Sequence, residues 1–496
     1  MINHLTKEVK LIIQTLNQAG FKAYIVGGAV RDLLLGRVPQ DFDIATEAVP
    51  DQIVAVCTCQ GWKIIDKLGR NFGVVAVVIH NLVFEVATFR GESYGTDAHR
   101  PEQVWYGKSL AEDLVRRDFT INAMALALDG KLVDLFHGQQ DLADRFIRTV
   151  GSAKQRFSED ALRMFRACRF ASQLGFTVDQ EAVAVMPQLT ARVSGLALER
   201  VKAELCLILL ADKPAIGLDL LVKSGLAEAS CRVKEQGSYQ KVAILPEIVD
   251  LVGIQQNPAF HIFDVWQHTL AAVTAVAPDL TLRWSALLHD VAKGRPGVRG
   301  KNAAGQITDY GHDKLGAQLA AAILQRLGFG DKFVKRVCWL VGKHMRFHFN
   351  YSNVLYCQGI NSLRHWVREE ARSGMFRTGS ELTEAFQQLS AVSFADAYAT
   401  GRGNLDAVGQ QRFQLILAEI LQSKPIHTSE LAFTAKSIFT EPDERKLIGP
   451  CLKLLLQRVQ DGNLSNNNEQ LTSAAGKWLD RVRDKKKGLS DIGSRS

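Results

Sequence analysis

The sequence lacks a long uncharged apolar run. No apolar stretch approaches the roughly 18 residues that a membrane-spanning helix requires. Lys7, Glu8 and Lys10 interrupt the N-terminus where a secretory signal would carry its apolar core. These absences argue against helical membrane spans and against export, so we expect a cytoplasmic protein that does not bind membranes.

Cysteine and proline are scarce, with 8 and 12 residues in a chain of 496. The only closely spaced cysteines, Cys57 and Cys59, have no second pair that would complete a four-ligand zinc site. We therefore expect reduced and mostly buried thiols, not a disulfide framework or a zinc finger.

Low-complexity segments and internal repeats are absent as well. The apolar share is 47% and the charged share 23%, which is typical of folded globular proteins. At roughly 150 residues per domain, the length suggests about three domains. The 60 Lys and Arg residues exceed the 52 Asp and Glu residues, and the net charge is +8. This surplus favours a polyanionic partner, and a solvated basic surface explains it equally well.

The spacing of apolar residues predicts a small α+β domain followed by an all-α remainder. Residues 5–16 carry an apolar helical face, and the strand-like runs that follow are 23–26, 42–45, 74–79 and 82–87. From about residue 155 the apolar spacing becomes helical. The predicted regions are 1–150, 151–225, 226–403 and 404–496.

A first candidate site begins at Gly27 and Gly28, which follow a strand-like run and precede a helical one that contains Arg31. Glycine lets backbone approach a phosphate at such a turn. Asp41 and Asp43 follow, and two acids placed two residues apart on a strand point to the same face. Their like charges would repel unless a cation bridged them, and Mg²⁺ with substrate phosphates fits. A solvent-facing strand edge is the alternative for this acid pair taken alone.

Two later segments favour the metal-binding interpretation of Asp41 and Asp43 over the solvent-facing strand edge. Glu85 is a third acid in a strand-like run, and residues 112–123 read Glu-Asp-Leu-Val-Arg-Arg-Asp-Phe-Thr-Ile-Asn-Ala. The order Gly-Gly-x-x-Arg-Asp, Asp-x-Asp, Arg-Arg-Asp-Phe-Thr-Ile-Asn-Ala resembles the bacterial tRNA nucleotidyltransferase and poly(A) polymerase family, class II of the polymerase-β-like nucleotidyltransferases. The resemblance covers roughly residues 20–225. It implies a polymerase-β-like head with a small mixed sheet, followed by a helical neck.

The resemblance also implies residue roles in a two-metal nucleotidyl transfer. Asp41 and Asp43 would hold Mg²⁺, and Glu85 would complete the acidic set. The implied nucleotide-binding residues are Gly27, Gly28, Arg31, Arg117, Asp118, Asn122, Asp160, Arg163 and Arg166. A structural ion pair is the alternative for Arg116, and Glu199 and Arg200 match a further family motif that we expect to be structural.

Asp160 and Arg163 match the Glu-Asp-x-x-Arg motif that reads the incoming base in this family. Three residues apart, they are expected to share a helix face. A carboxylate accepts from the amino group of cytosine or adenine while a guanidinium donates to the neighbouring ring nitrogen, so the pair can admit CTP and ATP and reject UTP and GTP. A surface salt bridge is the alternative.

Two segments indicate which nucleotides the enzyme would add. Residues 91–109 resemble the family's flexible element needed for the final A, which argues against an enzyme that adds only C. Residues 67–73 resemble the CCA-adding branch more than the bacterial poly(A) polymerases.

Histidines cluster in the next region, where six of 12 lie between residues 257 and 350. The order His, His-Asp, His, His, Asp resembles the HD-domain phosphohydrolases, and the implied metal ligands are His268, His289, Asp290, His312, His344 and Asp396. Lys293 is a candidate phosphate contact. The donor set suits Ni²⁺, Mn²⁺, Fe or Mg²⁺. A vestigial structural domain is the alternative.

Together these features predict a tRNA nucleotidyltransferase that adds CCA, or its terminal A, from CTP and ATP. An HD domain at 226–403 would add phosphatase or 2′,3′-cyclic phosphodiesterase activity, and the tail at 404–496 would bind tRNA. The alternatives are a poly(A) polymerase and an HD phosphohydrolase with an RNA-binding N-terminal region. The oligomeric state stays open.

Overall fold

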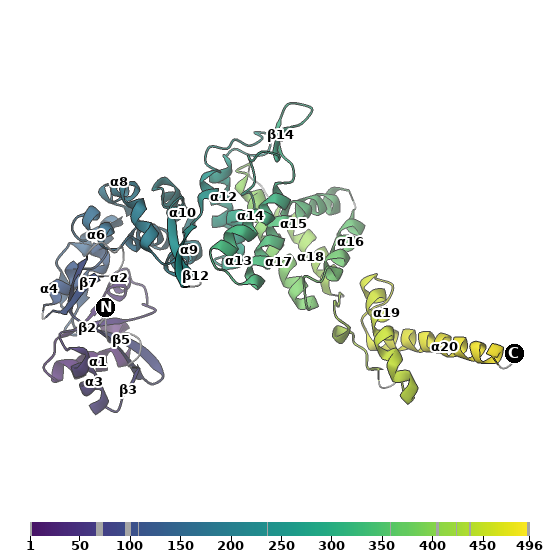
Figure 1. Ribbon diagram of the computed structural model, residues 1–496, viewed down its shortest axis with the longest axis horizontal. Helices are drawn as coiled ribbons and strands as arrows, with labels where there is room; N and C mark the ends of the chain where they lie inside the picture. Colours follow the sequence, from purple (N-terminus) through teal and green to yellow (C-terminus); the bar gives the residue numbers. More distant parts are fainter. Residues whose placement is uncertain are drawn as a thin grey trace. The chain divides into compact units, whose positions relative to one another are not determined.

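A computed structural model describes residues 2–65, 73–94, 101–107, 109–235, 237–357, 359–402, 406–422, 424–435 and 438–493. The chain forms two compact units (Figure 1). Unit 1 comprises Met1–Ile254, Ala277–Arg283 and Ala322–Gly330, and unit 2 comprises Gln255–Val276, Trp284–Ala321 and Asp331–Ser496. The four predicted regions therefore stay a prediction, and the proposed boundary at 403 lies outside the described residues.

Unit 1 begins with a small mixed sheet in the strand order β3-β4-β5-β2-β1-β8-β9. Its strands are β1 (Ala23–Val26), β2 (Asp43–Thr46), β3 (Lys63–Ile65), β4 (Val74–Ile79), β5 (Leu82–Thr88), β8 (Met124–Leu126) and β9 (Leu132–Asp134). Among the described strands of this sheet, β2 and β5 pair in parallel and the other neighbours pair antiparallel. The predicted α+β head with a small mixed sheet is confirmed. The expected strand at 42–45 is displaced, because β2 begins at Asp43 and Asp41 lies in a bend before it.

Short helices accompany this sheet. They are η1 (Ile2–His4), α1 (Lys7–Gln18), α2 (Gly28–Leu34), α3 (Pro50–Cys59), α4 (Leu110–Val115), η3 (Thr120–Asn122) and α5 (Gly138–Asp144). The side chain of Thr6 accepts a hydrogen bond from the Val9 backbone, so α1 starts at Lys7. Two further strands, β6 (Arg90–Tyr94) and β7 (Pro101–Tyr106), form a separate ribbon.

The rest of unit 1 is mainly helical. Its helices are α6 (Ala153–Glu159), α7 (Leu162–Leu174), α8 (Gln180–Leu189), η4 (Thr190–Gly195), α9 (Leu198–Leu210), α10 (Pro214–Lys223) and α11 (Pro246–Val249). Two small sheets interrupt them: β10 (Phe146–Ile147) with β11 (Thr177–Val178), and β12 (Ser230–Glu235) with β13 (Ser238–Ala243). The strands β11, β12 and β13 lie in the part of the chain that the sequence predicted to be all-α, so that prediction is wrong for these short strands.

The next part of the chain is a helical bundle, most of it in unit 2. Its elements are α12 (Val265–Ala275), α13 (Leu280–Leu288), β14 (Arg299–Lys301), β15 (Ile307–Asp309), α14 (His312–Arg326), α15 (Asp331–Tyr356), α16 (Ile360–Arg372), α17 (Gly379–Ala399) and α18 (Ala407–Gln422). Aromatic edge-to-face contacts join α15, α16 and α17, as between Trp339 and Phe386 and between Trp366 and Phe386.

The tail has its own apolar core. Its elements are η5 (Thr428–Glu430), η7 (Pro442–Leu447), α19 (Ile448–Gln460) and α20 (Asn468–Gly493). Leu455 of α19 and Leu471 of α20 are fully buried in that core. No helix within the described residues is long and apolar enough to cross a membrane. All eight cysteines are free thiols, and four of them are buried, fewer than expected.

Candidate functional sites

A cavity of about 930 Å³ in unit 1 brings together all nine predicted nucleotide-binding residues. Eight arginines and six aspartates line it: Arg31, Arg37, Arg116, Arg117, Arg163, Arg166, Arg169, Arg200, Asp32, Asp41, Asp43, Asp118, Asp160 and Asp212. Fixed charges of both signs suit a ligand that is itself an anion with bound cations.

Gly27 holds the turn between β1 and α2 in a conformation that other residues disfavour, with a φ of 73°. A Cβ atom there would lie 2.9 Å from Arg117 Nη1 and 3.2 Å from Asp43 Oδ2. Glycine therefore keeps the space between a cation and a candidate metal ligand open.

The three candidate metal acids come from adjacent segments. Asp43 and Glu85 are directly paired in the parallel register of β2 and β5, so their side chains share a face of the sheet. Asp41 reaches the same cavity from the bend before β2, not from the strand that the sequence predicted. Glu85 is exposed but is not among the cavity-lining residues.

The electrostatics of Asp43 suit a cation. The protein atoms packed around its carboxylate raise its pKa above the ordinary value; Arg117 opposes the shift and Asp41 adds to it. Unlike the groups of unit 2 described below, the three acids do not bring their oxygens within 4.8 Å of one another.

A hydrogen-bonded chain connects four of the predicted nucleotide-binding residues. Arg31 Nη1 donates to Asn122 Oδ1 at 2.8 Å, and Asn122 Nδ2 donates to Asp118 Oδ1 at 3.2 Å. Arg166 Nε donates to the other oxygen of Asp118 at 2.7 Å. Burial alone would raise the pKa of Asp118, but Arg166 and these hydrogen bonds lower it to about 2. Asp118 is therefore a fixed negative charge.

Arg116 and Arg117 share a partner that the sequence analysis missed. Their guanidinium groups lie 2.6 Å and 3.0 Å from the two carboxylate oxygens of Asp113, whose side chain is fully buried. Burial would raise the pKa of Asp113, but the two arginines lower it. The structural ion pair considered for Arg116 is present, and Arg117 takes part in it while also lining the cavity.

The expectation that Asp160 and Arg163 share a helix face is wrong. Asp160 is extended, with φ −141° and ψ 106°, and lies between α6 and α7. Its carboxylate accepts the Leu162 backbone N–H at 3.0 Å, which caps α7 and requires a non-helical residue at this position. Both side chains nevertheless line the cavity.

Each of the two residues already has partners. Arg163 Nη1 donates to Glu159 at 2.7 Å, and its Nη2 donates to the Arg116 carbonyl at 2.8 Å. Asp160 lies 3.3 Å from Arg200, which places the expected structural residue Arg200 at the cavity wall. Of the two segments 67–73 and 91–109, residues 67–72 lie outside the described residues. Residues 91–109 are described except for 95–100 and 108, and they contribute to the ribbon of β6 and β7.

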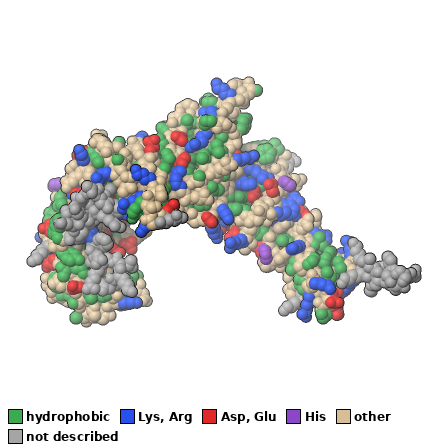
Figure 2. Space-filling view, viewed as in Figure 1, with side chains coloured by type: hydrophobic (Ala, Val, Ile, Leu, Met, Phe, Trp, Pro, Cys, Tyr) green, Lys and Arg blue, Asp and Glu red, His purple; other side chains and the backbone are tan. Residues whose placement is uncertain are grey.

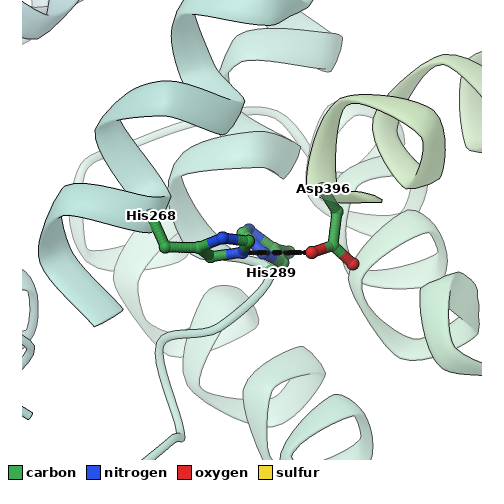
Figure 3. Close-up of side chains that lie close together, drawn as sticks. All are labelled: His268, His289 and Asp396. Carbon is green, nitrogen blue, oxygen red and sulfur yellow. Dashed lines mark hydrogen bonds and ion pairs between the residues drawn. The ribbon is translucent and has the colours of Figure 1, made fainter. Parts of the chain in front are cut away.

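In unit 2, all six predicted HD ligands converge. Two groups of three place their ligand atoms within 4.8 Å of one another: His268, His289 and Asp396, and Asp290, His312 and His344. Figure 3 shows the first group, with Asp396 of α17 facing two imidazoles. Asp396 Oδ1 lies 3.0 Å from His268 Nε2 and 3.6 Å from His289 Nε2. All six side chains are buried.

Backbone carbonyls orient three of these histidines. His289 Nδ1 donates to Ala286, His312 Nδ1 to Asp309 and His344 Nδ1 to Val341, at 2.8, 2.6 and 2.6 Å. A carbonyl only accepts, so Nδ1 carries the hydrogen and Nε2 of a neutral ring carries a lone pair. The Nε2 atoms of His312 and His344 lie 3.1 Å apart. Two lone pairs at that distance require a cation between them, a proton or a metal ion.

Asp290 joins the two groups. Its Oδ2 lies 3.2 Å from His289 Nε2, and its Oδ1 lies 3.3 Å from His312 Nε2. Oδ1 is buried and has no hydrogen-bond partner within the described part of the chain. Lys293, the predicted phosphate contact, lies 2.7 Å from Asp290 Oδ2 and donates to Gln256.

The surroundings push the histidine pKa values apart. Burial lowers the pKa of His344 to about 3, with the neighbouring His312 adding to the shift. Burial also opposes a charge on His289, but Asp290 and Asp396 raise its pKa to about 10. A metal ion can replace the proton that these carboxylates hold on His289.

Two histidines at this site were missed by the sequence analysis. His348 Nε2 lies 2.8 Å from Asp396 Oδ2, on the opposite carboxylate oxygen from His268. The ring of His261 lies 5.0 Å from that of His268, edge to face. The four-residue spacing from His344 to His348 along one helix was the available signal.

Three protein-family models match separate segments of the chain. Residues 23–148 match the family model of the poly A polymerase head domain, residues 175–230 that of the probable RNA and SrmB-binding site of polymerase A, and residues 261–399 that of the HD domain.

Among curated proteins, a CCA-adding enzyme of Levilactobacillus brevis is 46% identical over 228 residues, 45% of this chain and 56% of the relative. A CCA-adding enzyme of Geobacillus sp. is 48% identical over 215 residues, 43% of this chain and 52% of the relative. The chain therefore spans about half the length of the curated relatives it matches.

Among solved structures, the CCA-adding enzyme of Bacillus stearothermophilus in complex with CTP is similar over 97% of this chain and 98% of that one. The identity is 26% and the TM-score 0.62. The predicted resemblance to this group of nucleotidyltransferases, with an added HD domain, is confirmed for the fold and for these domains.

Proposed function

We propose that this chain is a nucleotidyltransferase that adds CCA or its terminal A to tRNA from CTP and ATP. Its N-terminal part matches the poly A polymerase head domain, and its middle part matches the HD domain. The observation that carries the proposal is the cavity of about 930 Å³, in which the glycine turn, Asp41, Asp43 and the Asp160–Arg163 segment face one space. The CCA-adding relatives named above support the same reading.

Asp41 and Asp43 would hold Mg²⁺, with Glu85 beside Asp43 in the sheet register. The raised pKa of Asp43 and the nearby like charge of Asp41 fit a bound cation. When bound, Mg²⁺ would lower the pKa of the primer hydroxyl and neutralise charge on the triphosphate.

The chain's own groups would position the nucleotide. Arg31 and Arg117 flank the turn at Gly27 and would hold the triphosphate, while Asn122 and Asp118 would bind the ribose. Arg166 keeps Asp118 ionised and in place. The rigid network therefore presents donors and acceptors in fixed positions before the substrate binds.

Base choice would depend on Asp160 and Arg163. Because Arg163 already donates to Glu159 and to two backbone carbonyls, its guanidinium is held in one orientation. A fixed guanidinium can discriminate between donor and acceptor atoms of a base because a mismatched base leaves it unpaired. Glu159 is thus a positioning residue in this account.

For unit 2, we propose a phosphohydrolase or 2′,3′-cyclic phosphodiesterase centre that holds two divalent metal ions, Ni²⁺, Mn²⁺, Fe or Mg²⁺. The two groups of three ligands would hold the metal, and the carboxylate of Asp290 faces His289 with one oxygen and His312 with the other. Such ions activate water against phosphoester bonds. Lys293 would keep the Asp290 carboxylate ionised and offer its charge to the phosphate.

The test uses purified protein with tRNA lacking CCA, tRNA lacking only the terminal A, and unrelated RNA, with each nucleotide supplied separately. Addition of C and A to the tRNA substrates supports the proposal. A-tailing of unrelated RNA would instead identify the runner-up, a poly(A) polymerase. Absence of any addition, with RNA binding retained, would leave an HD phosphohydrolase with an RNA-binding N-terminal region. We also propose a cytoplasmic location, where tRNA and both nucleotides are present.

A further inference from the structure

The hairpin β12–β13 carries its positive charge on one face. Arg232 is paired with Lys241 and Lys234 with Tyr239 in the antiparallel register. Directly paired residues, and residues two apart on a strand, share a face. Arg232, Lys234, Tyr239 and Lys241 therefore form one surface, here called the cationic face. Glu235 lies on the opposite face of the hairpin.

Positive charge is concentrated on this face of the hairpin. Arg232 and Lys241 are like charges placed directly opposite each other, which is unfavourable in a sheet. Lys234 and Lys241 are exposed, and within the described chain neither has an acidic group within ion-pair distance. Tyr239 is 60% exposed, and the Arg232 guanidinium lies 4.7 Å from the centre of its ring.

A hollow of about 550 Å³ adjoins the cationic face. Ser230 and Lys241, which lie on that face of the hairpin, also line the hollow, together with Thr190, Ser194, Ser224 and the single acid Glu228. The hydroxyls of Thr190 and Ser194 donate to the carbonyls of Pro187 and Ala191. Their oxygens keep lone pairs, which can accept hydrogen bonds from ribose hydroxyls.

The base of the hairpin is fixed to the neck. The Arg232 backbone N–H donates to the Leu196 carbonyl at 2.8 Å, which joins the hairpin to the preceding helical segment. The Ile244 backbone N–H donates to the Ala229 carbonyl at 3.0 Å and closes the base of the hairpin. Cys231 is fully buried. The cationic face is thus a rigid surface, held against the segment 175–230 that matches a probable RNA-binding family model.

Net charge alone does not locate such a surface, because Lys and Arg side chains are spread over the face drawn in Figure 2 with acidic side chains among them. We propose that the cationic face and the adjoining hollow bind the backbone of the RNA substrate, with Tyr239 stacked against a base or ribose. This inference rests on the proposed function. RNA is favoured over an acidic protein partner because the hollow offers acceptors for ribose hydroxyls and the face offers an aromatic ring beside three cations.

The test compares Lys234→Gln with Lys241→Gln in one chain against a matched control, Lys63→Gln with Lys131→Gln, which removes two exposed lysines from the sheet domain. Binding of tRNA lacking CCA is measured by fluorescence anisotropy over a range of salt concentrations. Each lost phosphate contact should lower the slope of log affinity against log salt by roughly 0.7 to 0.9. We expect the hairpin variant to lose about one to two units of slope and on the order of tenfold in affinity, and the control to match the wild type.

Tyr239→Ala should weaken binding by on the order of tenfold, and Tyr239→Phe should restore it because stacking needs only the ring. The inference is overturned if the wild type binds tRNA and adds nucleotides while the hairpin variants keep its affinity and salt slope. The cationic face would then be a candidate binding surface for an acidic protein. If the wild type adds no nucleotide to any RNA, the proposed function fails instead.

Discussion

In unit 1 the acidic side chains lie among arginines around an open cavity, whereas in unit 2 they lie among histidines in a closed core. Asp41, Asp43 and Glu85 are exposed. By contrast, His268, His289 and His344 are 0% exposed and Asp290 is 1% exposed. The two sites share no residue.

The difference indicates two kinds of ligand. Arginine stays protonated and only donates hydrogen bonds, so the arginines of unit 1 suit a large anion that enters with its own cations. Imidazole can offer a lone pair, so the histidines of unit 2 suit a bare metal ion. If the two sites work by separate chemistry, each can be inactivated without the other.

The largest expected effect is on nucleotide addition. Asp43→Ala should lower the rate on the order of a thousandfold or more, because losing a metal ligand removes several kcal/mol of transition-state stabilisation. Asp144→Ala, which removes an exposed aspartate of α5, is the control and should be unaffected. Primer-extension assays measure both rates. Similar rates for Asp43→Ala and the wild type would remove Asp43 from the catalytic set.

The second prediction concerns metal content. Asp290→Ala should empty the proposed two-metal centre, because its carboxylate faces both ligand groups. Elemental analysis should then fall from about two divalent ions per chain to a value near zero, and cyclic phosphate hydrolysis should cease. The control His365→Ala, which removes an exposed histidine of α16, should keep both the bound metal and the hydrolysis. A wild-type protein with neither bound metal nor hydrolysis would show that the cluster is structural.

The third prediction concerns stability. The pKa of Asp118 is about 2 in the folded chain and 3.8 ordinarily, so the folded state favours its charged form. This contributes about 2 kcal/mol above pH 4. Asp118→Asn should therefore lower the free energy of unfolding of unit 1 by about that amount at pH 7. Denaturant titrations should show the difference in unfolding free energy between wild type and variant decreasing as the pH falls from 4 toward 2. A difference that does not change with pH would mean that the folded state does not favour the charged form of Asp118.

The smallest expected effect is on base choice. Arg163→Ala should reduce discrimination against UTP and GTP by roughly tenfold, the cost of an unpaired polar group. Because Arg163 also holds Glu159 and backbone carbonyls, the melting temperature should fall as well. A lower melting temperature with unchanged selectivity would make Arg163 a structural residue alone.

Local sequence patterns predicted four of the seven described strands of the sheet, β1, β2, β4 and β5, and missed β3, β8 and β9. The strands at 23–26 and 74–79 have the expected bounds, because runs of buried apolar residues there have no competing signal. The hairpin β12–β13 was not predicted because its strands are largely polar, so no apolar alternation marks them.

The structure brings most of the predicted residues of each site together, but their roles stay predictions and their geometry could not be predicted from the sequence. All six HD ligands converge as expected from their order, because that motif specifies ligand types. Residue spacing could not predict the partners that the fold brings to these sites. Asp113 pairs with two arginines, and His348 contacts Asp396. Asp160 was misplaced because a helical spacing cannot reveal a side chain that caps the next helix.

The most direct test of the account assays wild type, Asp43→Ala and Asp290→Ala in the same preparations for two activities, nucleotide addition to tRNA lacking CCA and metal-dependent hydrolysis of a 2′,3′-cyclic phosphate. We predict reciprocal loss: Asp43→Ala loses addition and keeps hydrolysis, and Asp290→Ala does the opposite. Loss of both activities in either folded variant would contradict the claim of two separate sites.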